Sequence, residues 1–243
     1  MTVKAKIRLY VDAPLGKGQS LSLSKGHAHY ITGVMRQKAG AIVALFNGRD
    51  GEWQAELVDA GKRRAVLTCL QQSKAQKPPP DVWLYFAPIK KVRTDFIVEK
   101  AAELGVARIC PVQTDFTNAE RIRQDRLQAH AIEAAEQCGE TYVPPVEALQ
   151  KLDTVLTGWP TDRKLLFCDE TLVNDATQGL ADAKGKKWAI LIGPEGGFSD
   201  KEITKLRAMD VTHPISLGPR VLRADTAAVA ALTLWQNTLG DWR

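Results

Sequence analysis

The chain has 243 residues, of which 44% are hydrophobic and 25% are charged, which argues against a disordered chain and provides apolar side chains for a core. No apolar stretch approaches the roughly 18 residues of a membrane-spanning helix. The first ten residues also lack the apolar region of a secretory signal, so we expect a cytoplasmic protein. The four cysteines include no CxxC pair, which predicts reduced thiols and no metal site.

The net charge of +5 is unevenly distributed along the chain. Residues 1–77 carry 13 Lys or Arg and 5 Asp or Glu, a net charge of +8, whereas residues 78–243 carry 20 and 23, a net charge of −3. A small basic body joined to a slightly acidic remainder indicates a polyanionic partner. The alternative is a solvated basic surface with no specific ligand.

Three consecutive prolines in the segment SKAQKPPP divide the chain, because proline continues neither a helix nor a central strand. We expect one domain over residues 1–73, a linker over 74–80 and a second domain over 81–243. Alternating apolar residues before the linker predict a small β-barrel of five short strands. The predicted strands are 6–11, 20–24, 41–46, 52–58 and 64–70, and residues 27–36 are a candidate short helix.

Beyond the linker, strand and helix patterns alternate, which predicts an α/β fold with a mostly parallel sheet and helices on both faces. The capping box of Ser199 and Glu202 marks one helix start, and Gly105 and Gly139 suit the ends of two other helices. The predicted strands are 82–88, 108–112, 165–168, 188–192 and 214–217, and the predicted helices are 94–104, 126–138, 199–209 and 224–239.

Three loops follow predicted strands at the sheet edge where open parallel sheets bind ligands. They are residues 167–170 (FCDE), 192–198 (IGPEGGF) and 217–227 (LGPRVLRADTA). The glycines of the second loop allow close backbone approach by a ligand, although a plain tight turn is the alternative. Arg220 and Arg223 in the third loop are candidates to bind a phosphate or to polarise a carbonyl oxygen. The alternative is that each forms a surface ion pair.

Other features are less specific. Lys90, Lys91 and Arg93 form a basic cluster before a predicted helix, and phosphate contact and a solvated face fit it equally. The histidines form no triad and no metal-binding motif. The pair Asp225 and Thr226 also suits a simple helix start.

Four segments, in order along the chain, resemble the RsmE family of 16S rRNA (uracil-3)-methyltransferases of the SPOUT superfamily. They are KKVRTDFIVEKAAELGVARICPV, EAAEQCGETYVPPV, LIGPEGGFSDKE and LGPRVLRADTA. The resemblance implies a PUA-like N-terminal β-barrel that contacts RNA. It also implies a C-terminal SPOUT α/β domain whose trefoil knot forms the S-adenosyl-L-methionine pocket, and a homodimer that acts on 16S rRNA or the small ribosomal subunit.

The resemblance also implies site residues for methylation of uridine at ring nitrogen 3. Arg220 or Arg223 would stabilise the uracil anion, and a carboxylate or a water would take the proton, with Glu195, Asp169 and Asp225 as open candidates. The expected donor-binding residues are Phe167, Cys168, Asp169, Ile192, Gly193, Glu195, Gly196, Gly197, Leu217, Gly218, Leu222, Arg223 and Thr226. The expected RNA-binding residues, chosen for their charge, are Arg8, Lys25, Arg36, Lys90, Lys91 and Arg93.

The chain departs from the family pattern at several places. HAHYITGVMR stands where the family often has a pattern like HHL..VLR, and Glu140 replaces a usual arginine. Asp115 and Asp225 keep a carboxylate in segments that differ from the family's TERS and RTETA. Two other functions remain open: a SPOUT methyltransferase that acts on another rRNA or tRNA base, and a non-catalytic RNA-binding homologue.

Overall fold

The computed structural model describes residues 5–61, 64–119, 121–172, 180 and 185–242, and the chain forms two compact units. Unit 1 comprises Met1–Pro78 and Ala135–Val143, and unit 2 comprises Pro79–Ala134 and Pro144–Arg243. The first division falls inside the proline run. The sequence did not predict that residues 135–143 join the first unit. They do so because Arg8 and Lys74 donate hydrogen bonds to backbone carbonyls of this segment.

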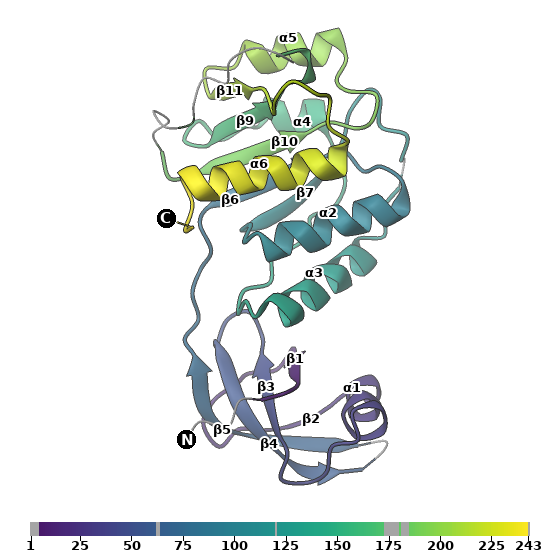
Figure 1. Ribbon diagram of the computed structural model, residues 1–243, viewed down its shortest axis with the longest axis vertical. Helices are drawn as coiled ribbons and strands as arrows, with labels where there is room; N and C mark the ends of the chain where they lie inside the picture. Colours follow the sequence, from purple (N-terminus) through teal and green to yellow (C-terminus); the bar gives the residue numbers. More distant parts are fainter. Residues whose placement is uncertain (1–4, 62–63, 120, 173–179, 181–184, 243) are drawn as a thin grey trace. The chain divides into compact units, whose positions relative to one another are not determined.

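Unit 1 is a curled five-stranded sheet in the order β1-β3-β4-β5-β2 (Figure 1). β1 pairs with β3 in parallel, and the other neighbours are antiparallel. Each predicted strand corresponds to an observed one, and the last runs longer than predicted because Lys74 still pairs with Glu52. The strands are β1 Arg8–Tyr10, β2 Ser20–Ser22, β3 Ile42–Phe46, β4 Glu52–Ala60 and β5 Ala65–Lys74.

The predicted helix of unit 1 is confirmed with a shifted start. Helix α1 covers Lys25–His29 and continues into a π-helical turn over Tyr30–Val34. The Ser24 hydroxyl accepts a hydrogen bond from the His27 backbone N–H, which caps the first turn. Ile31 is fully buried and joins the apolar side chains of the strands in one core.

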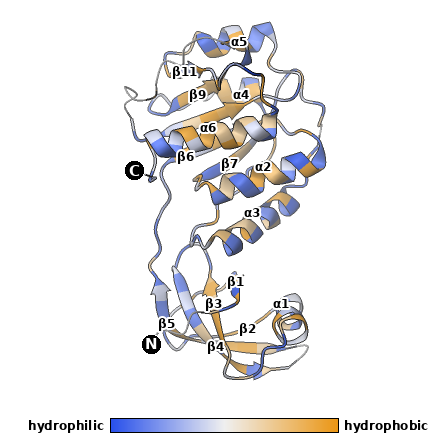
Figure 2. Cartoon of the chain, in the orientation of Figure 1, coloured by the Kyte–Doolittle hydropathy of each residue, from blue (hydrophilic) through white to orange (hydrophobic). Residues whose placement is uncertain are grey.

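Unit 2 contains a six-stranded sheet in the order β11-β9-β10-β6-β7-β8, and all of its strand pairs are parallel. β10 is buried along its whole length, and Figure 2 shows the central strands in hydrophobic colours. The strands are β6 Val82–Phe86, β7 Arg108–Gln113, β8 Gln150–Lys151, β9 Lys164–Cys168, β10 Trp188–Ile192 and β11 Thr212–Ile215.

Four helices of unit 2 correspond to those predicted, and three further short elements, β8, α4 and η2, were not predicted. The sequence missed β8 and α4, whose two and six residues are too short to establish a period. The predicted strand over residues 214–217 is wrong at both ends, because β11 begins at Thr212 and the chain turns after Ile215. The helices are α2 Lys91–Glu103, α3 Gln124–Cys138, α4 Leu152–Thr157, α5 Asp200–Arg207 and α6 Ala224–Thr238, with a 3-10 turn η2 over Glu170–Leu172.

The strand order determines where a site can form. β10 lies between β9 and β6, and β11 lies on the other side of β9, so the carboxyl ends of these four parallel strands are neighbours. Helices α2 and α6 lie side by side (Figure 1). No helix among the described residues is long and apolar enough to cross a membrane.

Candidate active site

The three loops singled out in the sequence line one cavity of about 370 Å³ in unit 2. Twelve of the fourteen predicted donor-binding or catalytic residues are in its lining, all except Phe167 and Thr226. Phe167 is fully buried, and its ring meets Phe198 edge to face with 5.2 Å between centroids, so it supports the cavity wall from behind. Thr226 is exposed in the first turn of α6.

Glycines give the second loop its shape. A Cβ on Gly193 would lie 2.7 Å from the Phe198 ring, so that ring packs directly on the Gly193 backbone. Gly197 has φ +71°, a conformation that favours glycine. A Cβ on Gly197 would also overlap the Glu170 carboxylate. Glu170 accepts a hydrogen bond from the Phe198 backbone N–H at 3.2 Å, which ties the first loop to the second.

Asp169 is held by an ion pair inside the protein. Its side chain has no exposed surface and pairs with Arg207 of α5, with 2.9 Å between Arg207 Nε and Asp169 Oδ2. Its other oxygen accepts hydrogen bonds from the backbone N–H and the hydroxyl of Thr171. Because both oxygens are occupied, Asp169 fixes the first loop and is poorly placed to take a proton.

Three charged side chains, Glu195, Arg220 and Arg223, lie exposed in the cavity lining. None of them forms an ion pair with another residue in the described part of the chain. Unpaired charged side chains in the lining of an open cavity are accessible to a ligand that enters it.

Cys168 is a buried thiol in the lining of the same cavity. Burial, assisted by the nearby Glu170 charge, raises the pKa of Cys168 to about 12. The thiol is therefore protonated at neutral pH and does not act as a nucleophile. The described residues contain no group of three or more His, Cys, Asp or Glu side chains that could hold a metal ion.

Several residues that line the cavity were not predicted from the sequence. Pro194, Ile215, Ser216, Val221, Ala224 and Ala227 also line the cavity, and all of them lie in or beside the predicted loops. Proximity to the strand ends is a signal that finds such residues. No sequence signal identifies Arg207, because its role arises from a contact with a residue 38 positions away.

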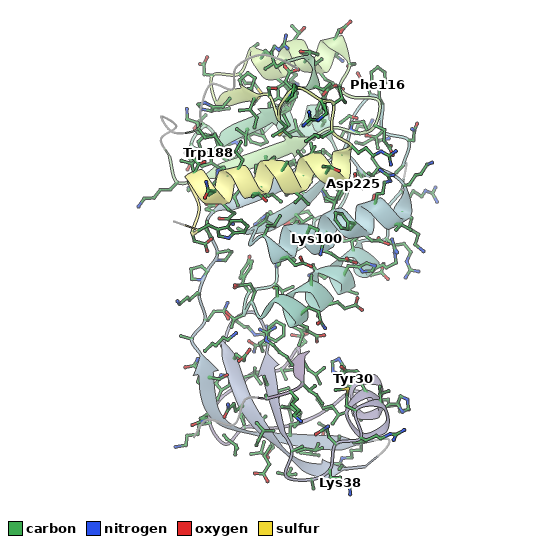
Figure 3. The ribbon with its side chains drawn as sticks, in the orientation of Figure 1. Tyr30, Lys38, Lys100, Phe116, Trp188 and Asp225 are labelled. Carbon is green, nitrogen blue, oxygen red and sulfur yellow. The ribbon has the colours of Figure 1, made fainter. Side chains whose placement is uncertain are left out.

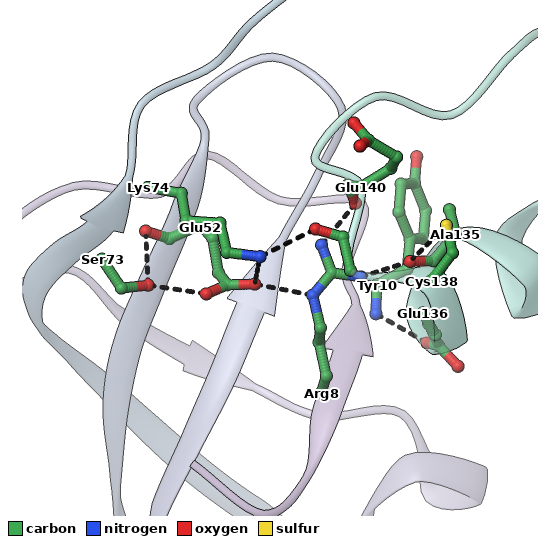
Figure 4. A network of polar contacts seen from close by, with 10 residues as sticks. Arg8, Tyr10, Glu52, Ser73, Lys74, Ala135, Glu136, Cys138 and Glu140 are labelled. Carbon is green, nitrogen blue, oxygen red and sulfur yellow. Dashed lines mark hydrogen bonds and ion pairs between the residues drawn. The ribbon is translucent and has the colours of Figure 1, made fainter. Parts of the chain in front are cut away.

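Arg8, which the sequence predicts to bind RNA, forms an ion pair and hydrogen bonds inside unit 1. Its side chain is 14% exposed, pairs with Glu52 at 2.6 Å and lies 3.7 Å from the Phe46 ring centroid. It also donates hydrogen bonds to the carbonyl oxygens of Ala135 and Glu140 (Figure 4). Three of the five guanidinium N–H groups therefore donate to partners within unit 1, which makes a structural role for Arg8 the simpler interpretation.

The other predicted RNA-binding residues are more accessible. Lys25 and Arg36 of unit 1 are exposed, as are Lys90 and Lys91 of unit 2. Arg93 is 30% exposed and lies 3.5 Å from the Asp225 carboxylate. These positions leave four lysine and arginine side chains free to meet a polyanion.

Comparisons with known proteins show the family to which the chain belongs. Residues 76–236 match the model of an RNA methyltransferase domain, and residues 23–69 match an RNA methyltransferase PUA domain. The chain is 31% identical to ribosomal RNA small subunit methyltransferase E of Rickettsia conorii, covering 93% of each chain. It is 29% identical to the protein of that name from Buchnera aphidicola, covering 97% of this chain and 95% of that one.

A solved structure has the same fold. The enzyme of that name from Neisseria gonorrhoeae, bound to S-adenosyl methionine, superposes with a TM-score of 0.86 at 28% identity, covering 98% of this chain and 99% of that one. These matches confirm the predicted fold class, a SPOUT α/β domain with a PUA-like N-terminal domain. The chain belongs to the ribosomal RNA small subunit methyltransferase E family of RNA methyltransferases.

Proposed function

We propose that this protein transfers the methyl group of S-adenosyl-L-methionine to ring nitrogen 3 of a uridine in the 16S rRNA of the small ribosomal subunit. The observation that carries the proposal is the cavity, in which two unpaired arginines and one unpaired carboxylate stand beside a glycine-rich wall. The family membership of the chain supports the same activity. We also propose that the protein acts in the cytoplasm, because its proposed substrate is the small ribosomal subunit.

The residues of the cavity fit the methyl donor. A volume of about 370 Å³ lies within the range of small-molecule sites. The backbones of Gly193 and Gly196 suit the polar edge of an adenine, and the side chains of Ile192, Leu217 and Leu222 suit its faces. When bound, the donor supplies an electrophilic methyl group on a positively charged sulfur.

The residues of the chain must then prepare the uracil. Its ring nitrogen 3 carries a proton and is a poor nucleophile at neutral pH, so a base must accept that proton. Glu195 is the best candidate among the three carboxylates considered. Asp169 is buried against Arg207, and Asp225 faces Arg93, whereas Glu195 is exposed in the cavity lining.

The developing uracil anion needs a positive partner. Arg220 and Arg223 both line the cavity, and a guanidinium beside a uracil oxygen would stabilise the negative charge as it forms. The reacting nitrogen lies on the edge that pairs with another base. The target uridine must therefore be unpaired or flipped out of its helix.

We propose that exposed and partly exposed cations bind the RNA backbone. Lys25 and Arg36 of unit 1 and Lys90, Lys91 and Arg93 of unit 2 are proposed to contact phosphates. We also propose that the protein acts as a homodimer. Val92 and Val221, with 79% and 74% of their surfaces exposed, are apolar side chains that a second copy would cover.

Nucleoside mass spectrometry of small-subunit rRNA tests the proposal. We expect 3-methyluridine to disappear when the gene is deleted and to return with the wild type but not with Arg223→Ala. Lys151→Ala, a change at an exposed lysine outside the cavity lining, is a control that should restore the modification. Unchanged 3-methyluridine would refute the proposal. Loss of another methylated nucleoside would indicate a different target base, and no loss at all would indicate a non-catalytic RNA-binding protein.

A further inference from the structure

A second depression, of about 250 Å³, lies beside the donor cavity. Its lining consists of Lys90, Arg93, Glu195 and Arg223, and it shares Glu195 and Arg223 with the donor cavity. The two hollows therefore meet at the carboxylate proposed to accept the proton and at one of the two arginines proposed to stabilise the uracil anion.

The charge of this second depression is positive. Lys90 and Arg223 are exposed and form no ion pair within the described chain. Arg93 lies 3.5 Å from Asp225, which is 20% exposed at the start of α6 (Figure 3). Three cations thus stand against two carboxylates, and a dianionic or monoanionic group entering the depression would find a net positive surrounding.

The N-termini of two helices add to the positive charge of the depression. Lys90 is the N-cap of α2 and Arg223 is the N-cap of α6, and neither side chain caps its helix by a hydrogen bond. A cation at a helix N-terminus is unfavourable, because that end carries a partial positive charge and free N–H groups. Serine, threonine, aspartate or asparagine would be the stabilising choices. Two cationic N-caps in one depression break this local rule together, which is expected where an anion is to be bound.

We propose that the depression binds a phosphate of the RNA nucleotide whose uracil faces the donor cavity. This inference rests on the proposed function and adds to it how the substrate is held. The phosphate lies between Lys90, Arg93 and Arg223, and the base of the same nucleotide reaches Glu195. Lys90 is then a positioning residue, because it holds the nucleotide without touching the reacting atoms.

Titration calorimetry on the full-length protein, saturated with S-adenosyl-L-homocysteine, tests whether the depression binds a nucleotide phosphate. The probes are uridine, uridine 5′-monophosphate and uridine 3′-monophosphate, so the two phosphate positions are compared directly. We expect one of the monophosphates to bind about tenfold more tightly than uridine, because a phosphate gains charge-assisted hydrogen bonds. Lys90→Ala should reduce that ratio to about twofold or less by removing one of these partners.

Lys201→Ala is the matched control. Lys201 is an exposed lysine in the first turn of α5 and the substitution removes the same charge, but Lys201 lines a different groove, with Asp115 and Lys205. It should leave the ratio unchanged. Equal affinities for uridine and both monophosphates, no measurable binding of any of them, or equal losses in the two variants would overturn the inference.

Turnover is measured separately, so the two proposals can fail independently. A wild-type protein that binds a monophosphate more tightly than uridine but leaves rRNA unmethylated would refute the proposed function and support phosphate binding in the depression. A wild-type protein that methylates uridine in rRNA but binds uridine and both monophosphates equally would refute only phosphate binding in the depression.

Discussion

Arg207 Nε donates a hydrogen bond to Asp169 Oδ2 at 2.9 Å, joining α5 to the loop that follows β9. The Asp169 side chain is fully buried, whereas that of Arg207 is 43% exposed. The pair holds the donor cavity's first loop against the helix that follows its second loop. A carboxylate in this position maintains the shape of the site.

Asp169→Asn should therefore lower stability more than it lowers turnover. We expect the free energy of unfolding to fall by about 1–3 kcal/mol, less than for a fully buried pair because Arg207 is partly solvated. Urea denaturation measures the loss, with Asp210→Asn at an exposed position as control. A variant of wild-type stability that transfers no methyl group at saturating substrate would instead make Asp169 the proton acceptor.

Gly197→Ala should weaken donor binding. The residue has φ +71°, and a Cβ there would overlap the Glu170 carboxylate. Either Glu170 or the loop must move, and both changes disturb the cavity wall. We expect the dissociation constant for S-adenosyl-L-methionine to rise about tenfold or more, equivalent to roughly 1.4 kcal/mol.

Calorimetry with the methyl donor measures this change. Gly158→Ala is a suitable control, because a Cβ there would lie 3.9 Å from the Thr154 carbonyl oxygen, an ordinary contact. Unchanged donor affinity in Gly197→Ala would show that the loop tolerates another conformation.

Arg8 and Lys25 should respond differently to substitution by alanine. Arg8→Ala removes an ion pair to Glu52 that is largely buried, so it should destabilise unit 1 by about 2–4 kcal/mol. Lys25→Ala should leave stability unchanged and reduce the salt dependence of rRNA binding, by about 0.7–0.9 in the slope of log K against log salt.

Thermal unfolding and filter binding at several salt concentrations separate the two effects. If Arg8→Ala were stable and lowered the salt slope as Lys25→Ala does, Arg8 would contact RNA after all. If Lys25→Ala left the slope unaltered, the exposed lysine would belong to a solvated surface without a phosphate partner.

Alkaline pH should destabilise the protein through its buried thiols. Burial raises the pKa of Cys110 and that of Cys168 to about 12, from an ordinary value of 9.0. Above pH 9 the unfolded thiols lose protons while the folded ones keep them, so the unfolded state is favoured. Stability is retained below about pH 9 and falls as the pH rises towards 12, by at most about 1.4 kcal/mol per pH unit for each thiol.

Urea denaturation at pH 8 and pH 10 measures this decline. Cys110→Ala should reduce the difference between the two pH values by about 1 kcal/mol, whatever it costs at either pH. Cys138→Ala, at an exposed position, should leave the difference unchanged. An equal decline in the wild type and in Cys110→Ala would assign the alkaline loss to other groups.

The sequence alone predicted most of the elements and the loops that line the cavity. Apolar alternation located the strands of both units except β8, and the Ser199–Glu202 capping box located the start of α5, where both capping hydrogen bonds are present. The glycines after β10 and the arginines after β11 identified the two loops that line the cavity. These signals are local, because a period, a cap or a turn depends on residues a few positions apart.

The tertiary structure decided what each charged residue does. Arg8, Asp169 and Lys90 were all candidate site residues in the sequence, but the residues near them in the chain do not reveal which side chains they meet. The fold places Arg8 against Glu52, places Asp169 against Arg207, and leaves Lys90 in a depression with two arginines. Such pairings join residues that are tens of positions apart in the chain. Only the strand order of each sheet and the packing of the helices bring these residues together, so their partners could not be determined from the sequence.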